Sequence, residues 1–169
     1  RGPSTIPVPA RSAQTLGVMK HRPIPPEYAK LADWLLPRML PWRRLTVAID
    51  GVDGSGKSSL ARFLAWQLEM PAIETDFFLR EGVSTPMHDA SSLKTLVEQR
   101  HHANRPVIVE GVLVLRQLSS IGVDPEILVR VEGVGRHGSQ SWQQEFARYL
   151  AQHPRAAQPD YTLSRSDCE

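Results

Sequence analysis

The feature of the sequence with the clearest chemical meaning is the run GVDGSGKS at residues 51–58. It matches the pattern G-x-x-x-x-G-K-[ST] in full, and its glycines let the backbone curl until successive N–H groups point at phosphate oxygens. Lys57 adds a mobile charge for the β- and γ-phosphates, and the Ser58 hydroxyl can bind Mg²⁺. We therefore expect a nucleoside triphosphate to bind through Gly51, Asp53, Gly54, Ser55, Gly56, Lys57, Ser58 and Ser59.

The segments on both sides of this loop have the patterns that the motif needs. Residues 45–49 form a short apolar run typical of a buried parallel strand. After the loop, residues 59–68 predict a helix with four apolar side chains on one face: Leu60, Phe63, Leu64 and Leu68. Strand, loop and helix therefore follow one another in the order that a phosphate-binding loop requires.

Two acidic residues stand at the ends of other predicted strands, where ligands of open parallel sheets bind. Glu110 follows the apolar run 106–109 and precedes a glycine, which is typical of an acid that holds Mg²⁺ beside a phosphate loop. A strand-terminal acid can also cap the next helix. Asp76 follows a strand at 71–75 and precedes two aromatic residues that could wall a pocket. It is a candidate catalytic base, with an ordinary loop aspartate as the alternative.

The whole chain alternates predicted strands with predicted helices. Strands are expected at residues 45–49, 71–75, 106–109, 127–131 and 161–163, and helices at 27–36, 59–68, 90–102 and 142–152, with a short helix or turn at 112–118. Residues 79–89 are expected to form a loop and residues 133–141 a mobile glycine-rich segment. This alternation predicts an α/β fold with helices on both faces of a parallel sheet. We expect one domain over residues 27–169, preceded by a Pro-rich N-terminal arm at residues 1–26.

The bulk composition limits the function classes. With 169 residues and 41% hydrophobic residues, one domain with an ordinary core is expected. A net charge of +2 is too small to indicate nucleic-acid binding, and no apolar stretch approaches the length of a membrane span. The single cysteine, Cys168, allows no internal disulfide, which favours a reducing, cytoplasmic location.

Several of these segments resemble the uridine kinase family of P-loop kinases. The resemblance rests on VAIDG at 47–51 running into GSGKS at 54–58, on DFF at 76–78, PMHD at 86–89 and VIVEGVL at 107–113. It covers about residues 45–132, and the phosphate loop and the Glu-Gly strand are its specific parts. It implies a three-layer P-loop NTPase fold with strand order 2-3-1-4-5. It also implies that Ser58, Asp76 and Glu110 surround Mg²⁺ and that Asp76 takes the proton from a substrate hydroxyl.

Two parts of the family's pattern are missing. The chain runs from His101-His102 directly to Arg105 and lacks the Tyr-Asp…His…Arg stretch that holds the nucleoside, so uridine itself is not implied. The arginine-dense lid is also thin. Cations that close over a transferring phosphoryl group stabilise its charge, so one arginine should act. The candidates are Arg136, Arg130 and Arg148. We predict that Arg136 is the one that closes over the phosphoryl group.

The sequence therefore predicts an ATP- and Mg²⁺-dependent kinase with Lys57, Asp76 and Arg136 as catalytic residues. It would move the γ-phosphate of ATP to a hydroxyl of a small nucleoside-like or sugar-like metabolite. A GTPase is disfavoured because Asn104, the only asparagine, begins no Asn-Lys-x-Asp motif. Two alternatives stay open: a gluconate-type sugar kinase, and a nucleotide-binding regulatory protein without phosphotransfer.

Overall fold

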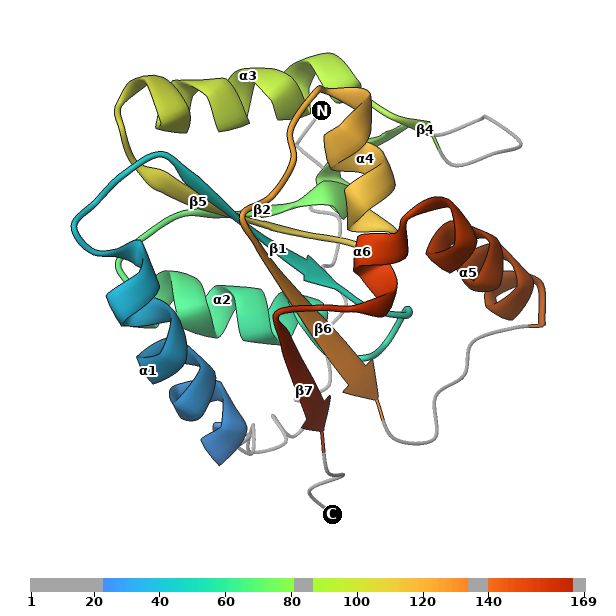
Figure 1. Ribbon diagram of the computed structural model, residues 1–169, viewed down its shortest axis with the longest axis horizontal. Coiled ribbons are helices and arrows are strands. Elements are labelled where there is room, and N and C mark those ends of the chain that lie inside the picture. Colours follow the sequence, from blue (N-terminus) through green and yellow to red (C-terminus); the bar gives the residue numbers. More distant parts are fainter. Residues whose placement is uncertain (1–22, 81–86, 134–139, 166–169) are drawn as a thin grey trace, which may run out of the picture.

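A five-stranded parallel sheet forms the centre of the molecule (Figure 1). The computed structural model describes residues 23–80, 87–133 and 140–165, so most of the predicted N-terminal arm lies outside it. The strand order is β2-β5-β1-β6-β7, which is 2-3-1-4-5 when these strands are counted along the chain, as the resemblance implied. The strands are β1 (Leu45–Asp50), β2 (Ala72–Glu74), β5 (Pro106–Glu110), β6 (Ile127–Gly133) and β7 (Tyr161–Arg165).

Helices cover both faces of this sheet, which confirms the predicted three-layer α/β fold (Figure 1). One face packs against α1 (Pro26–Met39) and α2 (Lys57–Gln67). The other face packs against α3 (Ala90–His102), α4 (Val114–Ser120), α5 (Gln140–Gln152) and α6 (Pro154–Ala157). None of the helices in the described part of the chain combines the length and the apolar character needed to cross a bilayer.

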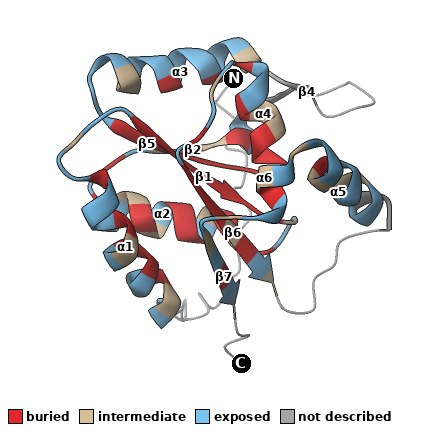
Figure 2. Cartoon of the chain, in the orientation of Figure 1, coloured by how far each residue is buried: buried red, intermediate tan, exposed pale blue. Residues whose placement is uncertain are grey.

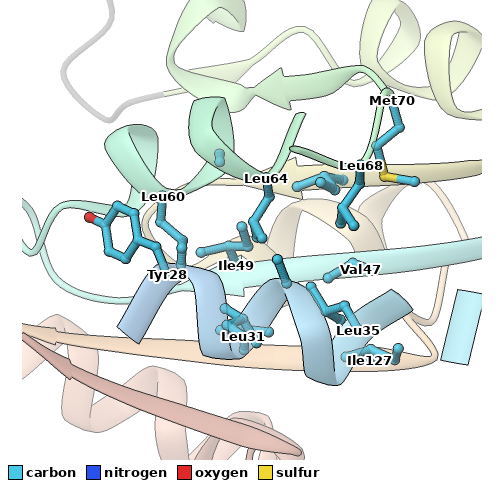
Figure 3. Packing of buried hydrophobic residues seen from close by; sticks show 14 of the residues in the cluster. Tyr28, Leu31, Leu35, Val47, Ile49, Leu60, Leu64, Leu68, Met70 and Ile127 are labelled. Atoms are coloured by element: carbon cyan, nitrogen blue, oxygen red, sulfur yellow. The ribbon is translucent and has the colours of Figure 1, made fainter. Parts of the chain in front are cut away.

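The two-residue period of the strands divides their side chains between two hydrophobic clusters. Val47 and Ile49 of β1 join the cluster under α1 and α2, which Figure 3 shows at close range, whereas Ala48 between them joins the cluster on the other face. The central strands are buried along their whole length, as the red ribbon in Figure 2 shows. Burying an aliphatic side chain of this size contributes about 1.5–3 kcal/mol, so these two clusters stabilise the sheet.

Some element boundaries differ from the predicted ones. Helix α1 continues through Pro37 to Met39, and the full burial of Met39 offsets the helical hydrogen bond that Pro37 cannot donate. Strand β2 ends at Glu74 and a 3₁₀ turn, η1 (Thr75–Phe78), replaces its predicted last residue. The predicted loop after it begins and ends in a short antiparallel pair, β3 (Leu79–Arg80) with β4 (Met87–His88). Residues 134–139 of the predicted mobile segment are outside the described ranges.

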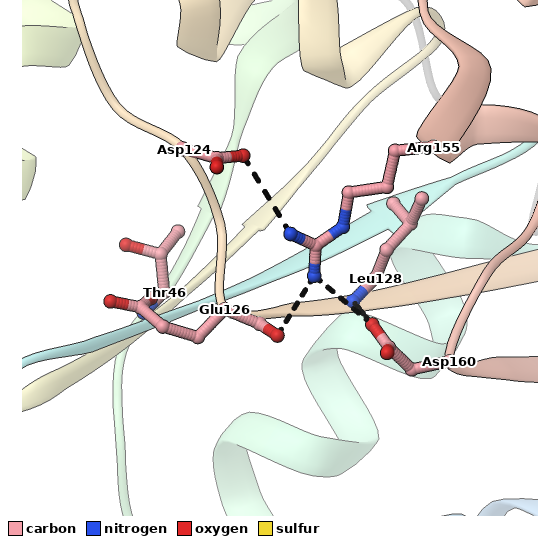
Figure 4. A network of polar contacts seen from close by, with 6 residues as sticks. All are labelled: Thr46, Asp124, Glu126, Leu128, Arg155 and Asp160. Atoms are coloured by element: carbon pink, nitrogen blue, oxygen red, sulfur yellow. Dashed lines mark hydrogen bonds and ion pairs between the residues drawn. The ribbon is translucent and has the colours of Figure 1, made fainter.

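A polar network fixes the end of the sheet where β1 and β6 begin (Figure 4). The Glu126 carboxylate accepts the Thr46 N–H at 2.6 Å, while the Glu126 carbonyl accepts a hydrogen bond from Arg155 at 2.8 Å. Arg155 also contacts Asp160, whose carboxylate accepts the Leu128 N–H at 2.7 Å. These bonds connect β1 to the start of β6, and β6 to the start of β7. They thereby help to fix the register of the three strands, including their C-terminal ends.

Candidate nucleotide site

The C-terminal edge of the sheet brings the predicted site segments together. In the strand pairing, Glu110 of β5 lies level with Ile49 of β1 and with Glu74 of β2. The phosphate loop follows β1 directly, and Asp76 lies two residues beyond the end of β2. Three separate parts of the sequence therefore meet at one edge, as expected for a parallel sheet.

The loop presents the N-terminus of α2 without a side-chain cap. Gly56, the N-cap residue, has a left-handed backbone with φ of 98°, a conformation that other residues rarely adopt. No side chain caps this helix in the described structure. The first N–H groups of a helix lack partners within the helix and carry a partial positive charge, so this terminus is suited to a phosphate.

Lys57 is folded back over the loop. Its Nζ donates a hydrogen bond to the Val52 carbonyl at 2.8 Å, and its residue surface is only 6% exposed. Burial lowers the pKa of Lys57, and nearby carboxylates, Glu110 first among them, oppose this shift. The ammonium group is therefore close to the loop and poorly solvated, so an anionic ligand would stabilise its charged form.

Ser58 and Glu110 join the loop to β5. The Ser58 hydroxyl donates to Glu110 Oε1 at 2.8 Å, and Glu110 is almost completely buried. Burial raises the pKa of Glu110, whereas the Ser58 hydrogen bond and the charge of Lys57 lower it. Helix α4 has Leu113 as its N-cap and no side-chain cap, so Glu110 contacts the phosphate loop rather than capping that helix.

These two oxygens fit the donor set that Mg²⁺ prefers. Mg²⁺ is commonly held by one or two protein oxygen ligands, with phosphate oxygens and waters completing the octahedron. Among the described residues no group of three or more His, Cys, Asp or Glu side chains could hold a metal ion by itself. A magnesium ion at Ser58 and Glu110 would thus depend on the triphosphate, and the predicted metal role of Asp76 stays a prediction.

Asp76 lies exposed in η1, on the side of the loop toward β2. Its charge raises the pKa of both Lys57 and Glu110, so it acts on the same site. Of the two aromatic residues expected to wall a pocket, Phe77 is 78% exposed and Phe78 packs against the cluster on the α3 and α4 face. The described residues thus give Asp76 an open surface.

The three arginines that are candidates for the lid differ in where they lie. Arg136 lies outside the described residues, so its predicted role stays a prediction. Arg130 points inward: its guanidinium donates to the Ala156 carbonyl, lies 3.9 Å from Asp50 and stacks over Phe146. Arg148 is exposed and lies 3.8 Å from Glu145.

Beside the loop lies a cavity of about 570 Å³ that was not predicted from the sequence. It lies between the start of the loop, the end of β6 and helix α5, and its volume is in the range of small-molecule sites. Its lining consists of Gly51, Val52, Arg130, Val131, Glu132, Gly133, Gln143 and Phe146. The cavity adjoins Val52, whose carbonyl holds Lys57, so it lies close to the predicted phosphate position.

Gly111, the glycine after Glu110, is required by close packing. A Cβ atom there would lie 2.0 Å from the Thr75 hydroxyl oxygen, which belongs to a fully buried side chain. We expect Gly111→Ala to destabilise the fold by about 1–3 kcal/mol in chemical denaturation, because the buried neighbour must move. The double variant Gly111→Ala/Thr75→Ala should recover most of this loss. Equal instability of the single and double variants would contradict the clash.

Comparison with known proteins shows the fold. No protein-family model and no curated protein sequence matches the chain. Among solved structures, a protein described as a possible uridine kinase from Bacillus stearothermophilus matches with a TM-score of 0.53 at 15% identity, covering 81% of this chain and 99% of that one. The chain therefore shares the fold of this protein, with a parallel sheet in the strand order 2-3-1-4-5 covered by helices on both faces.

Two further similar structures are a protein described as a fructose transport system kinase from Silicibacter sp. TM1040 and a sugar kinase from Janibacter sp. HTCC2649. The former has a TM-score of 0.48 and 18% identity over 80% of this chain and 98% of that one. The latter has a TM-score of 0.43 and 18% identity over 72% of this chain and 84% of that one.

Proposed function

We propose that this chain is a kinase that transfers the γ-phosphate of ATP to a hydroxyl group of a small, nucleoside-like or sugar-like metabolite. The observation that supports this most is the hydrogen bond between Ser58 of the loop and the buried Glu110 of β5. It joins a phosphate-binding loop to an acid at the distance at which both can serve one magnesium ion. Lys57 lies over the same loop.

In the proposed reaction the acceptor hydroxyl oxygen forms a bond to the γ-phosphorus while the bond from that phosphorus to the β,γ-bridging oxygen breaks, and ADP leaves. Asp76 accepts a hydrogen bond from the hydroxyl and takes its proton. Lys57 and the uncapped N-terminus of α2 hold the negative charge of the phosphates. Arg136 would supply a further cation from the lid. Ser58 and Glu110 would hold Mg²⁺, which would supply charge neutralisation at the phosphates.

A direct assay tests this function. The protein is incubated with ATP, Mg²⁺ and a panel of acceptors that includes nucleosides, sugars, gluconate and a metabolite extract, and new phosphorylated species are detected by mass spectrometry. We expect one acceptor class to gain one phosphoryl group with release of an equal amount of ADP. The Lys57→Ala variant serves as the blank for contaminating kinases.

The two alternatives make different predictions in this assay. A gluconate-type sugar kinase would phosphorylate gluconate or a related sugar acid in preference to nucleosides. A regulatory nucleotide-binding protein would bind ATP with a measurable Kd and give no phosphorylated product with any acceptor. The open surface around Asp76 and the missing nucleoside-holding segment are the features that keep these alternatives in the panel.

Glu110→Gln should raise the magnesium concentration needed for half-maximal turnover and lower the turnover itself. The amide keeps the size of the side chain but removes the charge that favours Mg²⁺. A magnesium titration of initial rates measures the effect. Glu74→Gln is the matched control, because Glu74 lies level with Glu110 in the sheet while both of its oxygens are held by Arg62 at 2.7 Å. A Glu110→Gln titration that overlays wild type would contradict the metal role.

A further inference from the structure

Asp50 is a buried carboxylate at the point where β1 becomes the phosphate loop, and the proposed reaction gives it no role. Its side chain is inaccessible to solvent. Oδ1 accepts the N–H of Gly51 at 3.0 Å, and Oδ2 accepts the hydroxyl hydrogen of Tyr149 at 2.8 Å. Burial raises the pKa of Asp50, and Tyr149, Arg130 and the backbone amides of Gly51 and Val114 lower it. A buried carboxylate is costly unless such donors and cations stabilise its charge, so these contacts stabilise the charged form of Asp50.

Tyr149 connects three elements at this point. It lies on α5, 99 positions after Asp50 in the sequence, and is fully buried. Its hydroxyl oxygen also accepts the N–H of Leu115 in α4 at 3.3 Å. The Arg130 guanidinium, 3.9 Å from Asp50, is farther from the carboxylate than the hydroxyl is. Tyr149 therefore makes the shortest of these side-chain contacts to Asp50, the last residue of β1 before the loop.

The start of the loop has little room to move. A Cβ atom on Gly51 would lie 2.4 Å from the Val131 carbonyl oxygen and 2.9 Å from the Ser55 hydroxyl oxygen. A Cβ atom on Gly133 would lie 3.2 Å from Ser55 Cα. The loop backbone thus packs directly on the end of β6. A small rotation of the peptide between Asp50 and Gly51 would be passed on to the rest of the loop.

We propose that Tyr149 is a positioning residue for the phosphate loop. Its hydrogen bond to Asp50 fixes the start of the loop and also anchors helix α5, which forms one wall of the neighbouring cavity. Phe146, one turn before Tyr149 on the same helix and 5.7 Å from it between ring centres, lines that cavity together with Gly51 and Val52. One side chain thus holds both the loop and the wall that faces it. This inference rests on the proposed binding of nucleotide by the loop.

The variant Tyr149→Phe tests the proposal because it removes only the hydroxyl group. We expect the Kd for Mg-ATP to rise about tenfold at a temperature at which the variant is fully folded, since the lost bond is one to a charged group. Amide hydrogen exchange in peptides covering residues 51–58 should become faster in the free protein. Tyr161→Phe is the matched control: it removes the same group from a ring of β7 that packs against Trp34 of α1, two strands away from β1, and should change neither readout.

A double-variant comparison separates positioning from general stability. In an Asp50→Asn background the contact is already altered, so Tyr149→Phe should then add less than about threefold to the Kd. Fully additive effects, or a Tyr149→Phe variant that loses thermal stability while loop exchange and Kd equal wild type, would overturn the proposal. If the protein binds ATP but phosphorylates no acceptor, the kinase proposal fails while these readouts still decide the role of Tyr149. If wild type binds no nucleotide, the proposed function fails and loop exchange alone decides.

Discussion

Replacing Lys57 by alanine should lower turnover at least about a thousandfold, the size of effect seen when one charged group that stabilises a transition state is removed. The variant leaves the backbone N–H groups of the loop in place, so nucleotide should still bind, with lower affinity. Steady-state kinetics with saturating ATP and the best acceptor from the panel measure the loss. Lys94→Ala is the matched control, because Lys94 is exposed on α3 and pairs only with Glu98 at 3.7 Å among its described contacts.

The same variant has a structural readout. A lysine in a phosphate loop without ligand is expected to face solvent, but the Lys57 side chain is buried against the loop and bonded to the Val52 carbonyl. Removing the ammonium group loses its hydrogen bond to Val52 but also relieves the cost of burying a charge. Because these two effects oppose each other, the free energy of unfolding should change by no more than about 1 kcal/mol. Unchanged turnover in Lys57→Ala would reject the use of the loop for phosphoryl transfer. A large loss of stability would instead assign Lys57 a structural role.

The sequence predicted the architecture because the local patterns and the fold agree. The helix expected at residues 90–102 is α3 with the same bounds, since Asp89 accepts the N–H groups of Ser91 and Ser92 at its start and Leu93 and Val97 face the core. The strand order followed from the resemblance rather than from any residue pattern. The pair β3 and β4 was missed because two-residue strands are too short to show an alternating pattern.

The parts of the site that depend on distant contacts could not be predicted. Asp50 directly follows the apolar run at residues 45–49, and its partner Tyr149 is 99 residues away, so no local pattern indicated their contact. Arg130 was likewise a candidate for the arginine lid that the resemblance implies. In the structure it faces inward, and its guanidinium contacts Ala156 and Asp50. Local sequence determines which elements form, whereas the pairing of buried polar groups follows from tertiary packing.

Asp76→Asn should lower turnover by a factor of about 10² to 10⁴ while the affinity for ATP changes little, if Asp76 serves the acceptor. The amide can still bond to the acceptor hydroxyl but cannot take its proton. Loose phosphoryl-transfer transition states need little early deprotonation, so lost orientation of the hydroxyl contributes to the effect as well. The exposed position of Asp76 is compatible with an acceptor that arrives from solvent.

Separate measurements of kcat and of the Kd for Mg-ATP distinguish the roles that Asp76 can have. Asp124→Asn is the matched control, because Asp124 is 90% exposed and precedes β6 at the opposite end of the sheet. If ATP binding collapses together with turnover, Asp76 mainly holds the magnesium–nucleotide complex, consistent with its electrostatic effect on Lys57 and Glu110. If neither quantity changes, Asp76 is a surface residue, and the base must be sought among the groups around the cavity between the loop, β6 and α5.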